Sequence, residues 1–249
     1  MAKTNVSRVV EDIYAIEHAF TNCYLVVDQT AVTVIDACFP STWSAVQECL
    51  TSIGRRVSDV AGLLLTHGHF DHVGFARHLQ TDLDIPVWIH QDDHWLAQHP
   101  YRYRPERDRL LYPLGHPRSL PVLTRMVAAG ALRVRGVQAT VTFESGRLDL
   151  PGSPIVVPTP GHTSGHCAFY LPDRDVVFTG DALVTLDPYT GRSGPRMVAP
   201  AATADVERNR RSLCQLGEVA AGVVLPGHGR PWRHGSAAAV SAALGPGRG

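Results

Sequence analysis

Residues 63–72 read Leu63-Leu64-Leu65-Thr66-His67-Gly68-His69-Phe70-Asp71-His72. The three leucines are typical of the end of a buried strand, and imidazole and carboxylate groups, the usual ligands of zinc and similar divalent ions, follow at once. Because side chains alternate along an extended turn, His67 and His69 point the same way while Asp71 and His72 point elsewhere. The stretch therefore predicts one metal ion and leaves room for a second. The alternative is a solvated, histidine-rich loop.

The size and charge of the chain favour one globular domain that acts on a small molecule. The 249 residues suffice for a large α/β domain, which we place at residues 1–244, with a disordered tail at 245–249. Lys+Arg and Asp+Glu both number 23, so no overall charge favours nucleic acid or an anionic membrane as a partner.

The chain carries no marks of export or of a membrane span. We find no apolar run of the roughly 18 residues that a spanning helix needs, and residues 1–10 lack the apolar core of a signal peptide. The five cysteines are widely spaced and form no C-x-x-C pair, as expected for core residues in a reducing compartment. They are Cys23, Cys38, Cys49, Cys167 and Cys214. A cytoplasmic location is the resulting expectation.

Strands and helices alternate along both halves of the chain. The expected strands cover residues 13–16, 23–27, 31–35, 62–66, 86–89, 155–159, 167–170, 176–179 and 223–225. The expected helices cover residues 41–53, 73–79, 203–216 and 236–244. Residues 28–30 are expected to form a hairpin turn. Because the second half repeats the pattern of the first, we expect two similar halves that share one site.

The segment at 90–136 differs in character, since it is rich in aromatic residues and arginines and has little strand pattern. We expect it to form a lid over the site or an oligomer contact, and, by analogy, a homodimer. Its aromatic residues Trp95, Tyr101 and Tyr103 are candidates for an apolar substrate pocket. Its arginines form either a solvated face or a grip on a substrate carboxylate or phosphate. They are Arg102, Arg104, Arg107 and Arg109.

Ligand-type residues also end three later strands. They are His162, Asp181 and His228, each beside a glycine that allows the backbone to turn tightly. A lone histidine at a strand end is usually structural, but the four strand ends together point to one metal site. Asp36 ends an earlier strand, and either orients a ligand histidine or forms a turn before a helix.

These strand ends resemble the motifs of the metallo-β-lactamase-fold hydrolases. The matching segments are Thr66-His67-Gly68-His69-Phe70-Asp71-His72, Thr159-Pro160-Gly161-His162-Thr163-Ser164-Gly165-His166, Phe178-Thr179-Gly180-Asp181 and Leu225-Pro226-Gly227-His228-Gly229. The resemblance extends from about Ile13 to the last expected helix. It implies an α/β fold, a four-layer αβ/βα sandwich with the site at one edge between the two sheets.

The resemblance also implies a ligand set for two divalent ions. His67, His69 and His162 would hold one ion, Asp71, His72 and His228 the second, and Asp181 would bridge them. Zinc is the usual metal of the family, and iron or manganese occurs in some members. Two such ions lower the pKa of a shared water and supply hydroxide, which attacks a carbonyl. Asp71 and Asp181 are thus the expected catalytic carboxylates, and Asp71 would also hand a proton to the leaving group. His166 is not a ligand position.

Departures from subfamily patterns narrow the expected substrate. Asp181 stands where true β-lactamases have cysteine or serine, so penicillin hydrolysis is disfavoured. Quorum-quenching lactonases often carry tyrosine three residues after the bridging aspartate, where this chain has Val184. Tyr189 lies nearby at another spacing, in a turn-rich loop at 187–192, and is a further candidate substrate residue. We therefore expect hydrolysis of an ester-type carbonyl, with lactone or thioester favoured over amide.

Two alternatives remain open. The first is a mononuclear iron persulfide dioxygenase, in which His67, His69 or its neighbours, His162 and Asp181 supply the ligands. The second is a catalytically silent protein that uses the metal as a scaffold or binds a ligand without turnover.

Overall fold

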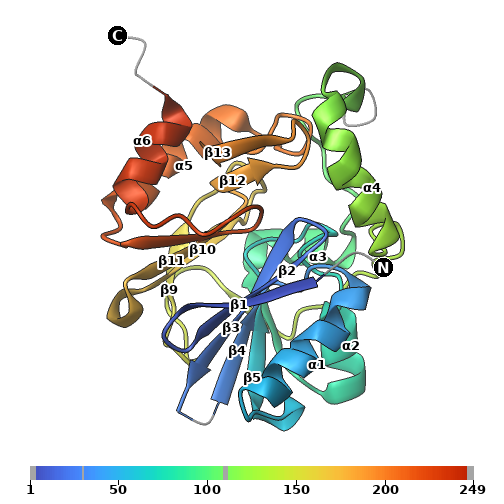
Figure 1. Cartoon of the computed structure of the whole chain (residues 1–249), viewed down its shortest axis with the longest axis vertical. Coiled ribbons are helices and arrows are strands. Elements are labelled where there is room, and N and C mark those ends of the chain that lie inside the picture. The colour runs from blue at the N-terminus through green and yellow to red at the C-terminus, as the bar shows by residue number, and fades with distance from the viewer. Residues whose placement is uncertain (1–3, 30, 109–111, 246–249) are drawn as a thin grey trace.

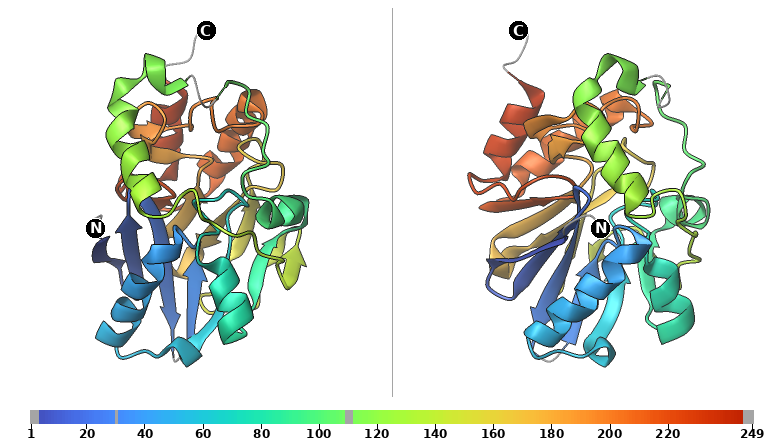
Figure 2. Two further views of the ribbon diagram at one scale, coloured as in Figure 1. Left: turned by 90° about the vertical axis from the view of Figure 1, so that its right-hand side faces the viewer. Right: turned by 45° about the vertical axis from the view of Figure 1, so that its right-hand side comes forward.

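The computed structural model describes residues 4–29, 31–108 and 112–245. Two β-sheets stack face to face, and helices cover the outer face of each sheet (Figures 1 and 2). This is the four-layer αβ/βα sandwich that the sequence predicted. In the described part of the chain, no helix is long and apolar enough to span a membrane.

The first sheet has seven strands in sequence order. They are β1 (Thr4–Val10), β2 (Ile13–His18), β3 (Thr21–Asp28), β4 (Ala31–Ile35), β5 (Val60–Leu64), β6 (Val87–His90) and β7 (Val141–Phe143). Strands β1 to β4 pair antiparallel, and β4 to β7 pair parallel. The change follows from the connections, because a helix links β4 to β5 and another links β5 to β6.

The second sheet has the strand order β14-β11-β10-β9-β8. Its strands are β8 (Gly146–Arg147), β9 (Ile155–Pro158), β10 (Cys167–Leu171), β11 (Val176–Gly180) and β14 (Val223–Pro226), and a separate hairpin joins β12 (Val184–Asp187) to β13 (Arg192–Arg196). The helices are α1 (Trp43–Ser52), α2 (Ala76–Leu83), α3 (His94–Gln98), α4 (Leu120–Ala128), α5 (Val206–Glu218) and α6 (Ser236–Leu244).

Three apolar clusters hold the layers together. One lies between the first sheet and the helices α1 and α2, and includes Val46, Leu63 and Leu79. A second fills the space between the two sheets, and a third lies between the second sheet and α5 and α6. Burial of apolar surface on both faces explains why inner strands such as β3, β5 and β11 are mostly apolar, whereas the edge strands β1 and β8 are more polar and largely exposed.

Most expected elements form, and the departures have local causes. Helix α2 begins at Ala76 rather than Val73, because the amides of Gly74 and Phe75 donate to the carbonyls of Cys38 and Ala37 instead. Helix α5 begins after Asp205, whose side chain accepts from the amide of Arg208 at 2.8 Å.

Several short elements were not expected, among them β7, β8, α3 and α4, and some predictions fall on undescribed residues. Strand β1 was not expected, and the hairpin β12–β13 replaces the loop expected at 187–192, of which residues 188–191 form the turn. Helix α6 covers the expected range and ends at Leu244. Residues 246–249 of the expected tail, Thr30 of the expected turn and Arg109 lie outside the described residues.

The segment at 90–136 splits into two structural parts. Residues 91–98 form a 3-10 turn and α3, which buries Leu96 and Ala97 against the core. Helix α4 follows later, buries Val122 and Met126, and runs along one side of the molecule (Figures 1 and 2). Arg102, Arg104 and Arg107 are exposed.

Candidate metal centre

The seven ligand-type residues meet at one edge of the sandwich because their strands end there. His67 to His72 follow β5 of the first sheet. His162, Asp181 and His228 follow β9, β11 and β14 of the second sheet, and these three strands run the same way. The site therefore joins the two halves of the fold.

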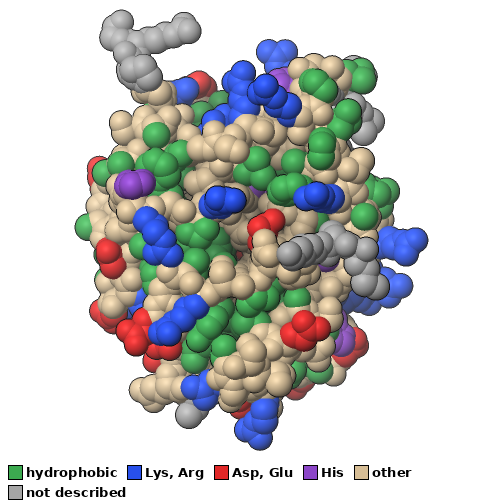
Figure 3. Space-filling model, in the orientation of Figure 1, with side chains coloured by type: hydrophobic (Ala, Val, Ile, Leu, Met, Phe, Trp, Pro, Cys, Tyr) green, Lys and Arg blue, Asp and Glu red, His purple; other side chains and the backbone are tan. Residues whose placement is uncertain are grey.

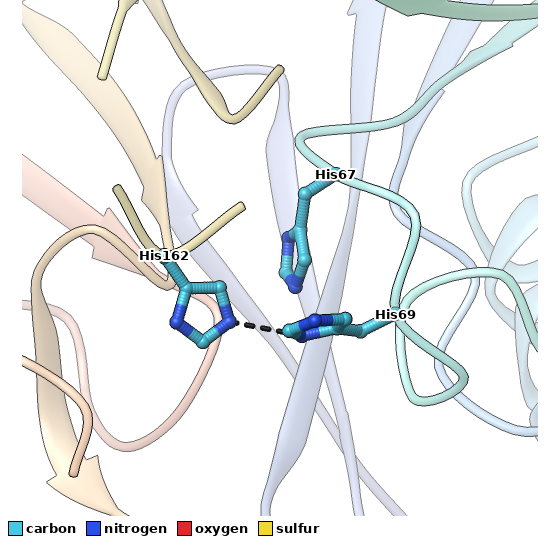
Figure 4. Close-up of side chains that lie close together, drawn as sticks. All are labelled: His67, His69 and His162. Carbon is cyan, nitrogen blue, oxygen red and sulfur yellow. Dashed lines mark hydrogen bonds between the residues drawn. The ribbon is translucent and has the colours of Figure 1, made fainter. Parts of the chain in front are cut away.

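The first cluster consists of His67, His69 and His162, whose rings converge in Figure 4. Nε2 of His162 lies 3.0 Å from Nδ1 of His69. The ring centroid of His67 lies 4.7 Å from that of His69 and 4.8 Å from that of His162. All three side chains are buried. Three convergent ring nitrogens of this kind suit a divalent metal ion.

The second cluster consists of Asp71, His72 and His228. Nε2 of His228 lies 3.4 Å from Oδ2 of Asp71. The three side chains are buried, and Asp71 also lines the adjacent pocket.

Asp181 lies between the clusters. Its Oδ2 is 3.5 Å from Nε2 of His162 and 3.2 Å from Nε2 of His228. Its Oδ1 is 3.4 Å from Nε2 of His72. One carboxylate therefore reaches ligand atoms of both clusters.

The partners of Nδ1 fix the tautomers of two histidines of the first cluster. The hydroxyl of Thr66 donates to Asp36, so it accepts from Nδ1–H of His67 at 3.0 Å. The hydroxyl of Thr203 donates to a carbonyl and so accepts from Nδ1–H of His162 at 3.3 Å. In both rings Nε2 is left with a lone pair directed at the site.

Hydrogen bonds at Nδ1 also fix the tautomers of the two histidines of the second cluster. Nδ1 of His72 donates to Oδ2 of Asp36 at 2.9 Å, and Nδ1 of His228 donates to the carbonyl of Phe20 at 2.8 Å. Their Nε2 atoms therefore face the site without a proton of their own when the rings are neutral.

Unpartnered buried atoms test whether a metal fits these residues. Nε2 of His67, His72 and His228 and Oδ1 of Asp181 are buried and make no hydrogen bond in the described structure. Leaving a buried polar atom unpaired costs about 1–3 kcal/mol, so these four atoms need partners at the site. Divalent cations held by the two clusters would satisfy them, and the donor set is one that zinc, iron or manganese accepts.

The pKa values of the histidines also favour a bound cation at the site. Burial lowers the pKa of His162 to about 4. Burial also acts to lower the pKa of His228, but the carboxylates of Asp181 and Asp71 together outweigh it and raise that pKa to about 10. The pKa of His72 is likewise raised, because Asp36 and Asp181 outweigh its burial. Without a cation the carboxylates thus hold protons on two rings, and a metal ion would replace those protons.

Asp36 supports the loop that carries the ligands. Its Oδ1 accepts from the amide of Thr66 at 2.8 Å, and its Oδ2 accepts from the Thr66 hydroxyl at 2.8 Å as well as from His72. Asp36 therefore contacts one ligand histidine directly and holds the residue that precedes another. Of the two roles that the sequence left open, this geometry matches orientation of a ligand histidine.

His166 lies beside the clusters with both nitrogens engaged. Nδ1 lies 2.8 Å from the hydroxyl of Thr159, and Nε2 accepts from the amide of Asp181 at 3.0 Å. It therefore holds the backbone of Asp181 in place and has no nitrogen left for an ion.

Sequence reasoning missed Asp93. This buried carboxylate follows strand β6 and accepts hydrogen bonds from the ligand-bearing loops. Like Asp36, it follows the end of a parallel strand, and this position could have identified it. It lies, however, in the segment at 90–136, which we expected to form a lid or an oligomer contact.

A narrow pocket opens beside His69, Asp71, Asp181 and His228. Its cavity volume is about 20 Å³, room for about one water molecule. The rest of its wall is mainly apolar, and the residues that contribute are Phe70, Tyr103, Leu123, Met126, Pro188, Tyr189, Val198 and Ala202. Leu123 and Met126 come from α4, so this helix covers the pocket.

The four candidate substrate residues lie in different places. Tyr103 and Tyr189 line the pocket, with their hydroxyl oxygens 3.4 Å apart. Tyr101 stacks on Phe70 and donates to the carbonyl of Ala131 at 2.7 Å, so it supports the wall from behind. Trp95 is 54% exposed, packs on His99 and does not line this pocket.

The visible surface has no dominant charge. Figure 3 shows basic and acidic side chains interspersed on one face of the molecule, with apolar side chains between them. This distribution accords with the balanced composition.

Comparison with known proteins identifies relatives over most of the chain. The family model of the metallo-beta-lactamase superfamily matches residues 17–228. An uncharacterized protein of Bacillus subtilis, YobT, is 28% identical over 162 residues, which are 65% of this chain and 61% of that relative, less than two thirds of its length. The probable metallo-hydrolase YflN of B. subtilis is 29% identical over 210 residues, 80% of this chain and 75% of that relative.

Solved structures share the fold. A metallo-beta-lactamase family protein of Thermus thermophilus, TTHA1429, superposes with a TM-score of 0.66 at 24% identity, covering 94% of this chain and 78% of that one.

Proposed function

Because the chain belongs to the metallo-beta-lactamase superfamily, we propose that it is a hydrolase that uses two divalent metal ions to cleave an ester-type carbonyl. Zinc is the proposed metal, and a lactone or a thioester is the proposed substrate. The proposed substrate is a small molecule, because the balanced charge of the chain favours neither nucleic acid nor an anionic membrane.

The placement of Asp181 carries this proposal. A carboxylate that reaches His162 on one side and both His72 and His228 on the other can bridge two ions. A protein built for a single ion in the first cluster would have no use for Asp71 and His228, which lie buried 3.4 Å apart beside the pocket.

Each group of residues has a proposed task. His67, His69 and His162 hold the first ion, and Asp71, His72 and His228 hold the second. Bound divalent ions supply Lewis acidity, which lowers the pKa of water and polarises a carbonyl oxygen. Asp71 lines the pocket, so its carboxylate can also carry a proton between the nucleophile and the leaving group.

The pocket wall favours a substrate with an apolar portion. Phe70, Leu123, Met126 and Val198 present apolar side chains to the space beside Asp71. The hydroxyls of Tyr103 and Tyr189 add polar groups that can orient a carbonyl or a ring oxygen. An acyl or alkyl substituent next to a lactone or thioester carbonyl suits this lining.

The test is turnover by the zinc- or manganese-loaded protein of a panel of lactones, aryl esters and acyl thioesters. We expect hydrolysis of at least one lactone or thioester, and loss of metal and most of the rate in Asp181→Ala and in His72→Ala. Asp173→Asn, which changes an exposed carboxylate, is the control. Full activity in both variants, or no turnover of any substrate, would contradict the proposal.

A further inference from the structure

Asp93 is a buried carboxylate that joins the two loops of the first cluster. It ends the 3-10 turn Gln91–Asp93 and is 1% exposed. Its Oδ2 accepts from the amide of Gly68 at 2.9 Å and from the hydroxyl of Thr163 at 2.6 Å. Its Oδ1 accepts from the amide of Gly165 at 2.7 Å.

These donors are next to the proposed ligands. Gly68 stands between His67 and His69, and Thr163 directly follows His162. The first loop belongs to the first sheet and the second loop to the second sheet. One side chain therefore sets the distance between histidines that come from opposite halves of the fold.

Close backbone packing shows that the arrangement is tight. A Cβ atom at Gly68 would lie 2.6 Å from the amide nitrogen of Ala97, and one at Gly165 would lie 2.6 Å from that of Asp93. Both loops are thus pressed against the start of α3. A side chain other than glycine at either position would separate them from Asp93.

Three hydrogen bonds hold this carboxylate. Among the described residues it forms no ion pair with lysine or arginine, and its partners are two amides and one hydroxyl. Donors directed at a buried carboxylate form strong, short bonds, and their loss leaves unpaired groups in the interior. Asp36 holds Thr66 and His72 in the same way on the other side of the site.

We propose that Asp93 is a positioning residue for the first metal ion: it fastens the loop of His67 and His69 to the loop of His162 without contacting the ion. The proposal rests on the metal centre of the proposed function. Because the second cluster is anchored by Asp36 and Phe20 instead, loss of Asp93 weakens binding of the first ion and spares the second.

The experiment compares Asp93→Asn on two backgrounds that each retain one cluster. In His228→Ala the first cluster remains, and in His69→Ala the second remains. Zinc affinity is measured by competition with a chromophoric chelator. We expect Asp93→Asn to weaken zinc binding about 10- to 100-fold in His228→Ala and to leave it unchanged in His69→Ala. Equal weakening in both backgrounds, or none in either, would overturn the proposal.

Asp92→Asn is the matched control, because it makes the same chemical change one residue away. The Asp92 side chain is 54% exposed, and the ring of His90 at 3.9 Å is its ion-pair contact among the described residues. Hydrogen exchange of the metal-free protein gives a readout that needs no ion. The amides of Gly68 and Gly165 should exchange faster in Asp93→Asn than in the parent and at the parent rate in Asp92→Asn. Unchanged protection in Asp93→Asn would contradict the proposal.

A second variant keeps the test valid if Asp93→Asn does not fold. Thr163→Val removes one of the three donors and keeps the carboxylate, so it should show the same preference for the first cluster with a smaller loss of affinity. Equal zinc affinity of Thr163→Val and its parent in His228→Ala would overturn the proposal. A wild-type chain that binds no zinc contradicts the proposed function itself, whereas two bound ions with equal effects of Asp93→Asn contradict only this inference.

Discussion

Oδ2 of Asp36 lies 2.9 Å from Nδ1 of His72, and both side chains are buried. The carboxylate accepts a hydrogen bond from Nδ1–H and so directs Nε2 at the site. Because Asp36 also accepts from Thr66, one residue fixes the ring of His72 and the backbone just before His67. The orientation of the ligands therefore depends on a residue that lies behind them.

Asp36→Asn should weaken metal binding while the chain stays folded. The amide nitrogen that replaces one carboxylate oxygen is a donor, so either the Thr66 amide, bound at Oδ1, or the Thr66 hydroxyl and His72, bound at Oδ2, lose their acceptor. We expect about 10- to 100-fold lower zinc affinity, measured by chelator competition. Asp173→Asn should behave as the parent does. Parent-like affinity in Asp36→Asn would show that Asp36 is only a turn residue.

Met126→Trp should obstruct the substrate pocket and leave the metal in place. Met126 lines the pocket from α4, whose next residue, Val127, is 50% exposed. We expect kcat/KM to fall about tenfold or more for the best lactone or thioester substrate, because the larger ring fills a narrow space. Val127→Trp is the matched control, with kcat/KM unchanged. Metal content should equal that of the parent in both; an active Met126→Trp would mean that substrate enters elsewhere.

The metal-free protein should be most stable near pH 6.5. Burial lowers the pKa of His162 to about 4. As pH drops from 6.5 to 4, this histidine binds a proton in the unfolded chain but not in the folded one, so the free energy of unfolding falls. The pKa of His228 is raised to about 10, because Asp181 and Asp71 together outweigh its burial, so its contribution is complete below pH 6.5 and is lost as pH rises to 10.

Urea unfolding across this pH range measures the effect. Loading with zinc should remove the alkaline decline, because metal-bound histidines carry no proton to lose. A metal-free protein whose stability keeps rising from pH 6.5 to 10 would contradict the charge distribution described for the site.

Cys214 should be the cysteine that reacts with a maleimide in the native protein. It is exposed on α5, while Cys23, Cys38, Cys49 and Cys167 are buried. Burial also raises the pKa of Cys49 to about 11 and that of Cys38 well above its usual range, so little thiolate is present. Mass spectrometry should find one adduct, and none in Cys214→Ser. A second adduct at a comparable rate would show that a buried thiol is accessible.

The sequence was sufficient for the sandwich and for the strand ends that meet at the site. His162, Asp181 and His228 each follow a short apolar run, and parallel strands bring such ends to one edge. Their role as metal ligands stays a prediction that the geometry supports.

Other features depend on contacts between distant segments. Asp93 acquires its position from donors near His69 and His162, which the sequence places far away. Helix α2 starts late because residues 37–38 capture the amides before it. Tyr189 reaches the pocket through the turn of a hairpin that its local sequence did not predict. In each case tertiary hydrogen bonding or packing overrides the local pattern.

The number and place of the metal ions decide between a two-metal hydrolase and a one-metal oxygenase. Elemental analysis of the purified chain, combined with a crystal structure that locates the ions by anomalous scattering, measures both. We expect two divalent ions per chain, one held by His67, His69 and His162 and the other by Asp71, His72 and His228, with Asp181 between them. A single iron per chain, with Asp71 and His228 unliganded and oxygen uptake on a persulfide substrate, would contradict the proposed two-metal hydrolase.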